Sequence, residues 1–182
     1  MTGEDVAARV HAYAWTDRKP GLERTRALLA ALGSPEKALK FVHITGSNGK
    51  TTTTSLIYKI MRDAGMRVAL GGNIGESFAY SVATGDYDWY VLELSSFQLD
   101  GMHKFRAHIG VLMNITPDHL DRYDHCFQNY ADSKMRITQN QTSRDYFVYS
   151  GDDEVIWQQV TVIHQRMGAL LIESGERSQV HL

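Results

Sequence analysis

Residues 41–54 read FVHITGSNGKTTTT, an apolar run followed by a glycine-rich turn, a lysine and four threonines. The first five residues are typical of a strand, and the apolar spacing beyond the turn predicts a helix from Lys50 to Ala64. A turn of this kind between a strand and a helix can direct its N–H groups around an anion, and the helix N-terminus adds to the attraction. The stretch therefore predicts an α/β fold that contains a phosphate-binding loop.

The spacing of this loop is shorter than the common pattern G-x-x-x-x-G-K-[ST], because Ile44 stands where the first glycine would be. Lys50 is expected to reach terminal phosphate oxygens, and the hydroxyl of Thr51 or Thr52 is expected to bind Mg²⁺. A glycine-rich turn without a ligand is the alternative, which the attached Lys-Thr pair and the preceding strand disfavour. The expected nucleotide-binding residues are Gly46, Ser47, Asn48, Gly49, Lys50, Thr51 and Thr52.

The rest of the chain alternates short apolar runs with helical patterns. Strands are predicted at 66–72, 88–94, 108–115 and 145–150, and helices at 22–32, 75–83 and 127–139. The last residues, from 160 to 182, are expected to add a pair of strands. Strands that alternate with helices predict a mostly parallel sheet with helices on both faces.

Composition limits the classes of function. The chain has 182 residues, 19 basic and 21 acidic, and a net charge of -2, so its overall charge does not favour nucleic acid binding. Cys126 is the single cysteine, which excludes an internal disulfide and suits a reducing compartment. The sequence shows neither a signal peptide at its start nor an apolar run of membrane-spanning length. We expect a cytoplasmic protein with no membrane or nucleic acid partner, whose oligomeric state the sequence leaves open.

Polar segments follow each predicted strand, at the edge where ligands gather in parallel sheets. Glu93 leaves an apolar strand, where an unpaired carboxylate would be unfavourable, so a cation or hydrogen-bond donors should meet it. His119 lies at another strand end and could be either structural or a ligand. The same loop contains further polar residues that could support the ligands of a site without binding the ligand directly, namely Asp118, Asp121, Asp124 and His125.

These motifs together resemble the Mur ligases. TGSNGKTT is similar to the short phosphate loop of that family and of the related folylpolyglutamate synthases. Within the Mur ligases, the D-glutamate-adding members are the most similar, and the resemblance covers the central ATP-binding domain over about residues 41–153. The segments that carry it, in the family's order, are GNIG (72–75), YVLELSSFQLDG (90–101), MNITPDHLDRYDH (113–125) and NYADSKMRI (129–137).

The resemblance implies roles for particular residues. Lys134 matches a lysine that is carbamylated in several Mur ligases, and a carbamate supplies the oxygen ligands that Mg²⁺ prefers. Two Mg²⁺ ions are expected, and Asn73 is expected beside the phosphates and the acyl group. The implied catalytic residues are Lys50, His119 and Lys134; the metal ligands are Thr51, Glu93, His119 and Lys134; the substrate side is lined by Asn73, Ser95, Ser96 and Gln98.

The implied reaction is an ATP-dependent amide ligation that passes through an acyl phosphate. Its substrates in the D-glutamate-adding members are UDP-N-acetylmuramoyl-L-alanine and D-glutamate, and the product is a peptidoglycan precursor. The phosphate loop and the metal ions would stabilise charge on the transferring phosphoryl group.

The N-terminal part differs from that pattern, because KPGLERTRALLAALGSPEKALKFVHITG (19–46) resembles folylpolyglutamate synthase. We therefore expect a helical arm at 1–40, an ATP-binding domain at 41–160 and an unassigned tail at 161–182. A UDP-binding domain does not fit into the 45 residues before Gly46, nor a C-terminal domain after Asp153. A folylpolyglutamate synthase-type ligase and a catalytically incomplete ATP-binding domain thus remain alternatives.

Overall fold

The structure, a computed structural model, describes residues 39–167 and 170–175 and contains one six-stranded parallel sheet in the order β2-β3-β1-β4-β5-β6. The strands are β1 (Lys40–Thr45), β2 (Val68–Gly72), β3 (Trp89–Glu93), β4 (Ile109–Leu112), β5 (Tyr146–Ser150) and β6 (Leu170–Ser174). The helices are α3 (Lys50–Asp63), α4 (Phe78–Thr84), α5 (Ser96–Asp100), η2 (Leu120–Arg122), α6 (Phe127–Met135), η3 (Arg136–Thr138) and α7 (Glu154–Met167).

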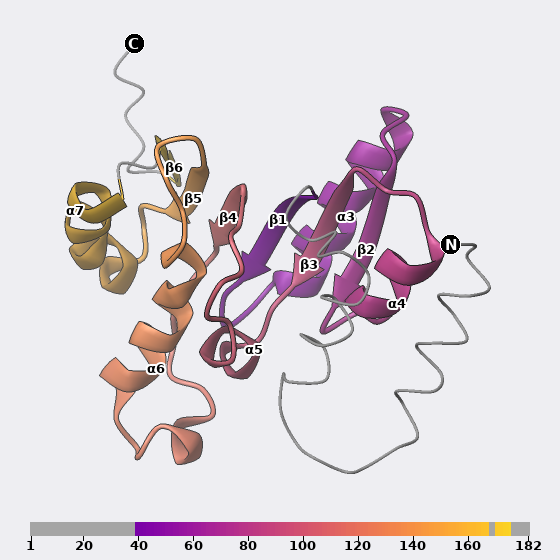
Figure 1. Cartoon of the computed structure of the whole chain (residues 1–182). Coiled ribbons are helices and arrows are strands. Elements are labelled where there is room, and N and C mark those ends of the chain that lie inside the picture. Colours follow the sequence, from indigo (N-terminus) through magenta and orange to yellow (C-terminus); the bar gives the residue numbers. More distant parts are fainter. Residues whose placement is uncertain (1–38, 168–169, 176–182) are drawn as a thin grey trace.

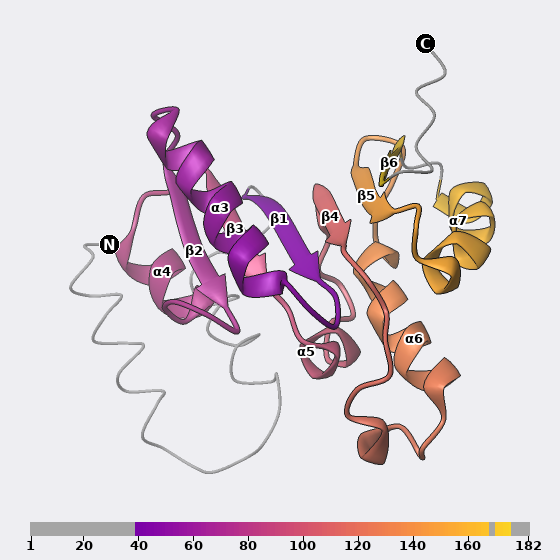
Figure 2. The same ribbon diagram turned by 180° about the vertical axis from the view of Figure 1, so that it is seen from behind.

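Helices cover both faces of the sheet, as the sequence predicts. Figure 2 shows α3 in front of β1, β2 and β3, whereas Figure 1 shows the opposite face with α4, α5, α6 and α7. Alternate residues of the strands divide accordingly between two apolar clusters. Val42 and Ile44 pack with Ile57 on the α3 side, and Phe41 packs in the larger cluster with Tyr130 of α6. The central strands are therefore buried on both sides, which explains their near-continuous apolar sequence.

The strand order places the phosphate loop at a ligand-binding edge. β1 continues through α3 on one face, whereas its neighbour β3 continues through α5 on the other face. Ile44 of β1 lies beside Glu93 of β3, so both strands end at the same edge. In open parallel sheets a crevice forms where neighbouring strands send their connections to opposite faces. The loop after β1 and the end of β3 thus lie at the edge where such sheets bind ligands.

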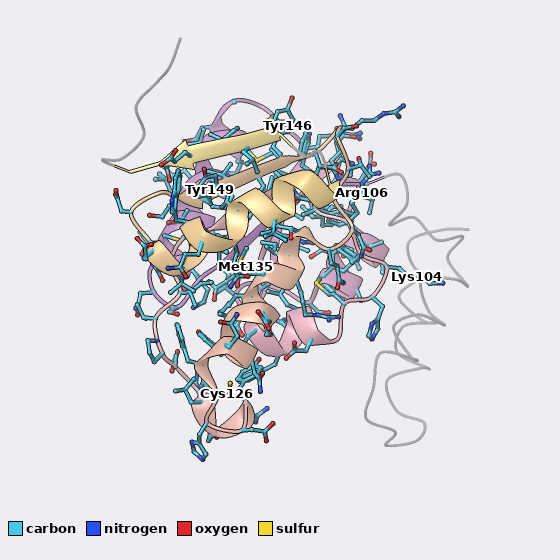
Figure 3. The ribbon with its side chains drawn as sticks, turned by 90° about the vertical axis from the view of Figure 1, so that its left-hand side faces the viewer. Lys104, Arg106, Cys126, Met135, Tyr146 and Tyr149 are labelled. Carbon is cyan, nitrogen blue, oxygen red and sulfur yellow. The ribbon has the colours of Figure 1, made fainter. Side chains whose placement is uncertain are left out.

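The C-terminal part differs from the prediction of a strand pair in 160–182. The residues up to Met167 form α7, and in the described part of this tail Leu170–Ser174 forms a strand that pairs with β5 in parallel. Figure 3 shows α7 lying alongside β5 and β6, and Met135 of the neighbouring α6 is labelled just below α7. Ile156 and Val160 are buried against the larger apolar cluster, so tertiary packing stabilises a helix in a segment rich in β-branched residues.

Other boundaries shift slightly, and the short helix α5 was not predicted. The predicted helix at 127–139 is divided into α6 and a tighter turn, η3, and β4 is shorter than the predicted 108–115. The expected domain boundary at residue 160 falls inside α7. The helix predicted at 22–32 lies outside the described residues. Within 39–167 and 170–175, no helix is long and apolar enough to cross a membrane.

Candidate functional site

The phosphate loop joins β1 to α3 as the sequence predicts. Gly49 is the residue before the first helical turn and has φ 76, a left-handed conformation that glycine adopts without strain. No side chain caps this end of α3, so the N–H groups of its first turn are available to an anion. The Nζ of Lys50 donates a hydrogen bond to the carbonyl of Ser47 at 2.8 Å, which folds this lysine over the loop. The local geometry suits phosphate oxygens.

Glu93 is the centre of the polar contacts at the end of β3. Its side chain is only 2% exposed, although it is a carboxylate. One carboxylate oxygen accepts a hydrogen bond from the Thr51 hydroxyl at 2.8 Å, and the other accepts one from the Asn73 side chain at 3.0 Å. The Asn73 N–H also donates to the Glu93 carbonyl at 2.8 Å, which fixes the end of β2 beside β3. Three predicted site residues are therefore in direct contact.

The donors that meet Glu93 are neutral, which fits a cation site. Among the ion pairs of the described residues, none includes Glu93. A buried carboxylate that lacks a full cationic partner is unfavourable unless a cation binds it. The carboxylate and the Thr51 hydroxyl are the hard oxygen ligands that suit Mg²⁺. In the described part of the chain, no group of three or more His, Cys, Asp or Glu side chains is arranged to hold a metal ion.

Lys134 is buried against the phosphate loop. It comes from α6, its side chain is 3% exposed, and its Nζ donates to the carbonyl of Gly46 at 2.8 Å. A second, longer contact joins the Nζ to the hydroxyl of Thr45 at 3.5 Å. The ammonium group also lies 5.3 Å from the centre of the Tyr130 ring. Lys134, which the family resemblance implied as a site residue, thus lies against the loop.

This environment disfavours the charged form of Lys134. Burial and, to a smaller extent, the positive charge of Lys50 lower the pKa of its amine to about 8. The negative charges of Asp118 and Glu93 act in the opposite direction and stabilise the ammonium form. The amine therefore loses its proton far more readily than an exposed lysine does.

His119 lies apart from these contacts. Its side chain is 59% exposed and its ring contacts are with Asp118, at 3.5 Å, and Phe97, at 5.6 Å between ring centres. The backbone of His119 is left-handed, with φ 50, and it precedes the short helix η2. No hydrogen bond or ion pair within the described residues joins it to Glu93 or Lys134. The nearby candidates Asp121, Asp124 and His125 are exposed.

The predicted substrate side has a structural role in this conformation. Ser95 precedes α5, and its hydroxyl accepts a hydrogen bond from the Gln98 N–H, while the Gln98 side chain accepts one from the Ser95 N–H. This reciprocal pair is a capping box, which the spacing S-x-x-Q indicates. Ser96 is buried at 2% exposure, and Gln98 is exposed. Of these side chains, Ser95 and Gln98 are at least partly accessible to a substrate.

Three residues outside the predicted site residues support the phosphate loop. Asn114 and Thr116, which follow β4, and Tyr130 of α6 form hydrogen bonds with Ser47. Asn114 also accepts a hydrogen bond from the N–H of Asn48 at 2.9 Å. The position of Asn114 and Thr116 after a strand at the ligand-binding edge was a usable signal, although the contact itself depends on the fold.

Comparisons with known proteins agree with this geometry. The profile of the Mur ligase middle domain matches residues 44–179. A Bacteroides fragilis protein named UDP-N-acetylmuramoylalanine–D-glutamate ligase is 67% identical over 117 residues, which are 64% of this chain and 26% of that protein. A Solibacter usitatus protein of the same name is 48% identical over 145 residues, 76% of this chain and 33% of that protein. The chain thus spans about a quarter to a third of the length of these relatives.

Solved structures share the fold. A UDP-N-acetylmuramoyl-L-alanyl-D-glutamate–2,6-diaminopimelate ligase has a TM-score of 0.65 at 20% identity, with 87% of this chain and 36% of that chain covered. The folylpolyglutamate synthase of Mycobacterium tuberculosis, complexed with ADP and AMPPCP, has a TM-score of 0.66 at 18% identity, with 96% of this chain and 51% of that chain covered. Such identities show the fold alone. Because the profile matches most of the chain and the motifs occur in order, the chain belongs to the Mur ligase family as a middle domain.

Proposed function

We propose that this chain is the nucleotide-binding part of a cytoplasmic, ATP-dependent ligase that joins D-glutamate to UDP-N-acetylmuramoyl-L-alanine in peptidoglycan precursor synthesis. The observation that carries the proposal is the buried Glu93 carboxylate, held by Thr51 and Asn73 beside an uncapped phosphate loop. The relatives named for this reaction, at 48% and 67% identity, support the choice of substrates.

The phosphate groups of ATP would bind at the N-terminus of α3. The N–H groups of the first helical turn supply donors, and the Lys50 ammonium supplies a positive charge within reach of the same loop. Its contact with the Ser47 carbonyl leaves other N–H donors of the ammonium group for a phosphate oxygen. Positioning and electrostatic stabilisation of this kind account for most of the catalysis of phosphoryl transfer.

Mg²⁺ would be held by Thr51 and Glu93, and a second ion by His119 and Lys134. A bound Mg²⁺ neutralises charge on the phosphate oxygens. The role of Thr51 and Glu93 rests on their direct contact and on the neutral hydrogen-bond donors that meet the carboxylate. The role of His119 requires its loop to approach Lys134, because its ring now contacts Asp118 and Phe97.

Lys134 would bind metal as a carbamate. Its neutral amine would attack CO₂ to form an N–C bond, and the proton that leaves the nitrogen would pass to solvent. The lowered pKa supports this step because it raises the fraction of neutral amine near neutral pH. The product is an anion with two oxygen atoms, which suits Mg²⁺ in a position where an ammonium group does not.

The ligation would proceed at this edge of the sheet. The substrate carboxylate would attack the γ-phosphorus of ATP, giving an acyl phosphate and ADP, and the amine of D-glutamate would then displace phosphate from the acyl carbon. Asn73 would contact the phosphates and the acyl group, and Ser95, Ser96 and Gln98 would line the substrate side. Gln98 is the exposed member of that set.

Nucleotide binding is tested by titrating MgADP into the protein in a calorimeter. The variant Lys50→Ala should lose at least tenfold in affinity, whereas Lys59→Ala, an exposed lysine on the same helix, should bind as the wild type does. The variant Glu93→Gln should lose Mn²⁺ affinity, measured by electron paramagnetic resonance. Equal nucleotide affinity in all these proteins would refute the assignment of the loop.

The substrates are tested by phosphate release from Mg-ATP with two pairs of substrates. Turnover with UDP-N-acetylmuramoyl-L-alanine and D-glutamate is the expected result. Turnover only with a reduced folate and L-glutamate would replace the proposed substrates. Nucleotide binding without turnover would identify this chain as a domain that needs the remaining parts of the ligase, in line with the share of the relatives that it spans.

A further inference from the structure

Asn114, the second residue after β4, forms hydrogen bonds with the phosphate loop. The Oδ1 of Asn114 accepts hydrogen bonds from the N–H groups of Ser47 and Asn48, both at 2.9 Å. Its Nδ2 donates to the Asn48 carbonyl at 3.2 Å. The backbone carbonyl of Asn114 accepts a further hydrogen bond from the Ser47 N–H at 3.0 Å. A single amide side chain therefore satisfies donors and an acceptor on two successive residues of the loop.

The Ser47 side chain extends the same connection. Its hydroxyl donates to the Thr116 carbonyl at 2.9 Å and accepts from the Thr116 N–H at 2.9 Å. The Tyr130 hydroxyl lies 3.0 Å from the same oxygen and, because the Ser47 proton is already donated, Tyr130 is the donor of this hydrogen bond. The loop after β1 and the loop after β4 are thus joined by both backbone and side-chain hydrogen bonds.

We propose that Asn114 is a positioning residue that sets which N–H groups of the loop meet the phosphates. It holds the N–H groups of Ser47 and Asn48 toward β4, so the anion is met by the N–H groups from Gly49 to Thr52 and by Lys50. The inference rests on the proposed nucleotide-binding function and adds a residue outside the loop that determines its conformation. Without the Asn114 amide, the Asn48 N–H loses its acceptor and the loop can adopt other conformations.

The first test needs no nucleotide. In the free protein, amide hydrogen exchange measured by NMR should show a protected Asn48 N–H, and Asn114→Ala should speed its exchange at least tenfold. The Ser47 N–H should change much less, since it keeps the backbone carbonyl of residue 114 as an acceptor. Asn114→Asp, which retains an acceptor oxygen, should restore the protection of Asn48. Equal exchange of Asn48 in the wild type and Asn114→Ala would overturn the proposal.

The second test uses MgADP. Affinity should fall about tenfold in Asn114→Ala, and the chemical shift changes on binding in the wild type should be largest at the N–H groups of residues 49–52. Asn140→Ala is the matched control, because the Asn140 side chain is likewise hydrogen-bonded to the backbone, donating to the carbonyls of His103 and Phe105, away from the loop. Its affinity should equal that of the wild type.

The outcomes separate this inference from the proposed function. A wild type that binds no MgADP would refute the proposed function, while the exchange of Asn48 would still decide whether Asn114 holds the loop. A wild type that binds MgADP, with an equal affinity in Asn114→Ala, would refute the positioning role alone. Unfolding curves of each variant establish that the fold is retained. A loss of MgADP affinity in Asn140→Ala as large as that in Asn114→Ala would also contradict the proposal.

Discussion

The burial of Lys134 predicts an unusual dependence of stability on pH. Because its pKa falls from the usual 10.5 to about 8, the charged amine is less favourable in the folded protein than in the unfolded chain. The difference of about 2.5 units corresponds to about 3 kcal/mol of free energy. Replacing Lys134 with methionine, which is similar in length and uncharged, should remove this term.

The sign of this pH dependence follows from whether the folded or the unfolded state binds the proton more tightly. Below a pH of about 8 the amine is protonated in both states, and the full penalty opposes folding. Between about 8 and 10.5 the folded protein releases its proton first, so the penalty shrinks as pH rises. From about pH 7 to about pH 9, this single group should raise the free energy of unfolding by about 1.3 kcal/mol.

Urea unfolding of the wild type, Lys134→Met and Lys59→Met, in buffers freed of CO₂, measures this contribution. Lys59 is exposed and pairs with Asp63 on α3, so its variant should keep the wild-type dependence on pH. The dependence should be flatter in Lys134→Met by about 1.3 kcal/mol over that range. An identical dependence of unfolding free energy on pH in all three proteins would refute the claim that the Lys134 amine is buried and has a lowered pKa in the folded protein. Added bicarbonate should flatten the wild-type slope if the amine becomes a carbamate.

Three further predictions test other parts of the structure. Asp153→Ala should lower the free energy of unfolding by about 2–4 kcal/mol, because the Asp153 carboxylate accepts hydrogen bonds from two N–H groups at the start of α7 and from the N–H of Ile115. Asp153→Asn should lower it by less, and urea unfolding measures both variants. Burial lowers the pKa of His43 to about 3, so its neutral form stabilises the fold above a pH of about 6.5 and this stability is lost as pH falls toward 3. From about pH 7 to about pH 5 the loss should be about 2 kcal/mol, and His43→Leu should be less sensitive in the same titration. Gly72→Ala should lower the free energy of unfolding by about 3 kcal/mol or more, because a Cβ there would lie 2.2 Å from a backbone oxygen. Gly65→Ala should lower it by only about 1 kcal/mol, because a Cβ there would have no atom within 4 Å. Thermal or urea unfolding measures both variants. Equal losses for the two glycines would contradict the close contact at Gly72.

Local patterns in the sequence were sufficient for the strand-loop-helix unit and for most of the sheet. The apolar runs of β1 and β3 and the glycines of the loop depend on neighbouring residues alone, and Glu93 at the end of an apolar strand predicts a carboxylate in need of donors. The parallel order follows from the alternation of strands and helices. The signal for α7 was present as well: Asp153 can cap a helix, and Ile156 and Val160 have helical spacing, but the β-branched residues around them favoured a strand.

The sequence by itself determined the phosphate loop and the parallel sheet, and it predicted that the Glu93 carboxylate needs a cation or hydrogen-bond donors, because each of these rests on short-range patterns. Tertiary structure decided the rest of the site. Lys134 lies 88 residues from Gly46 along the chain and Asn114 lies 66 residues from Asn48, yet both pairs are hydrogen-bonded. Contacts over such separations arise from the order of strands and the packing of α6, which no local pattern contains. The lowered pKa of Lys134 and the orientation of the loop N–H groups are therefore properties of the fold.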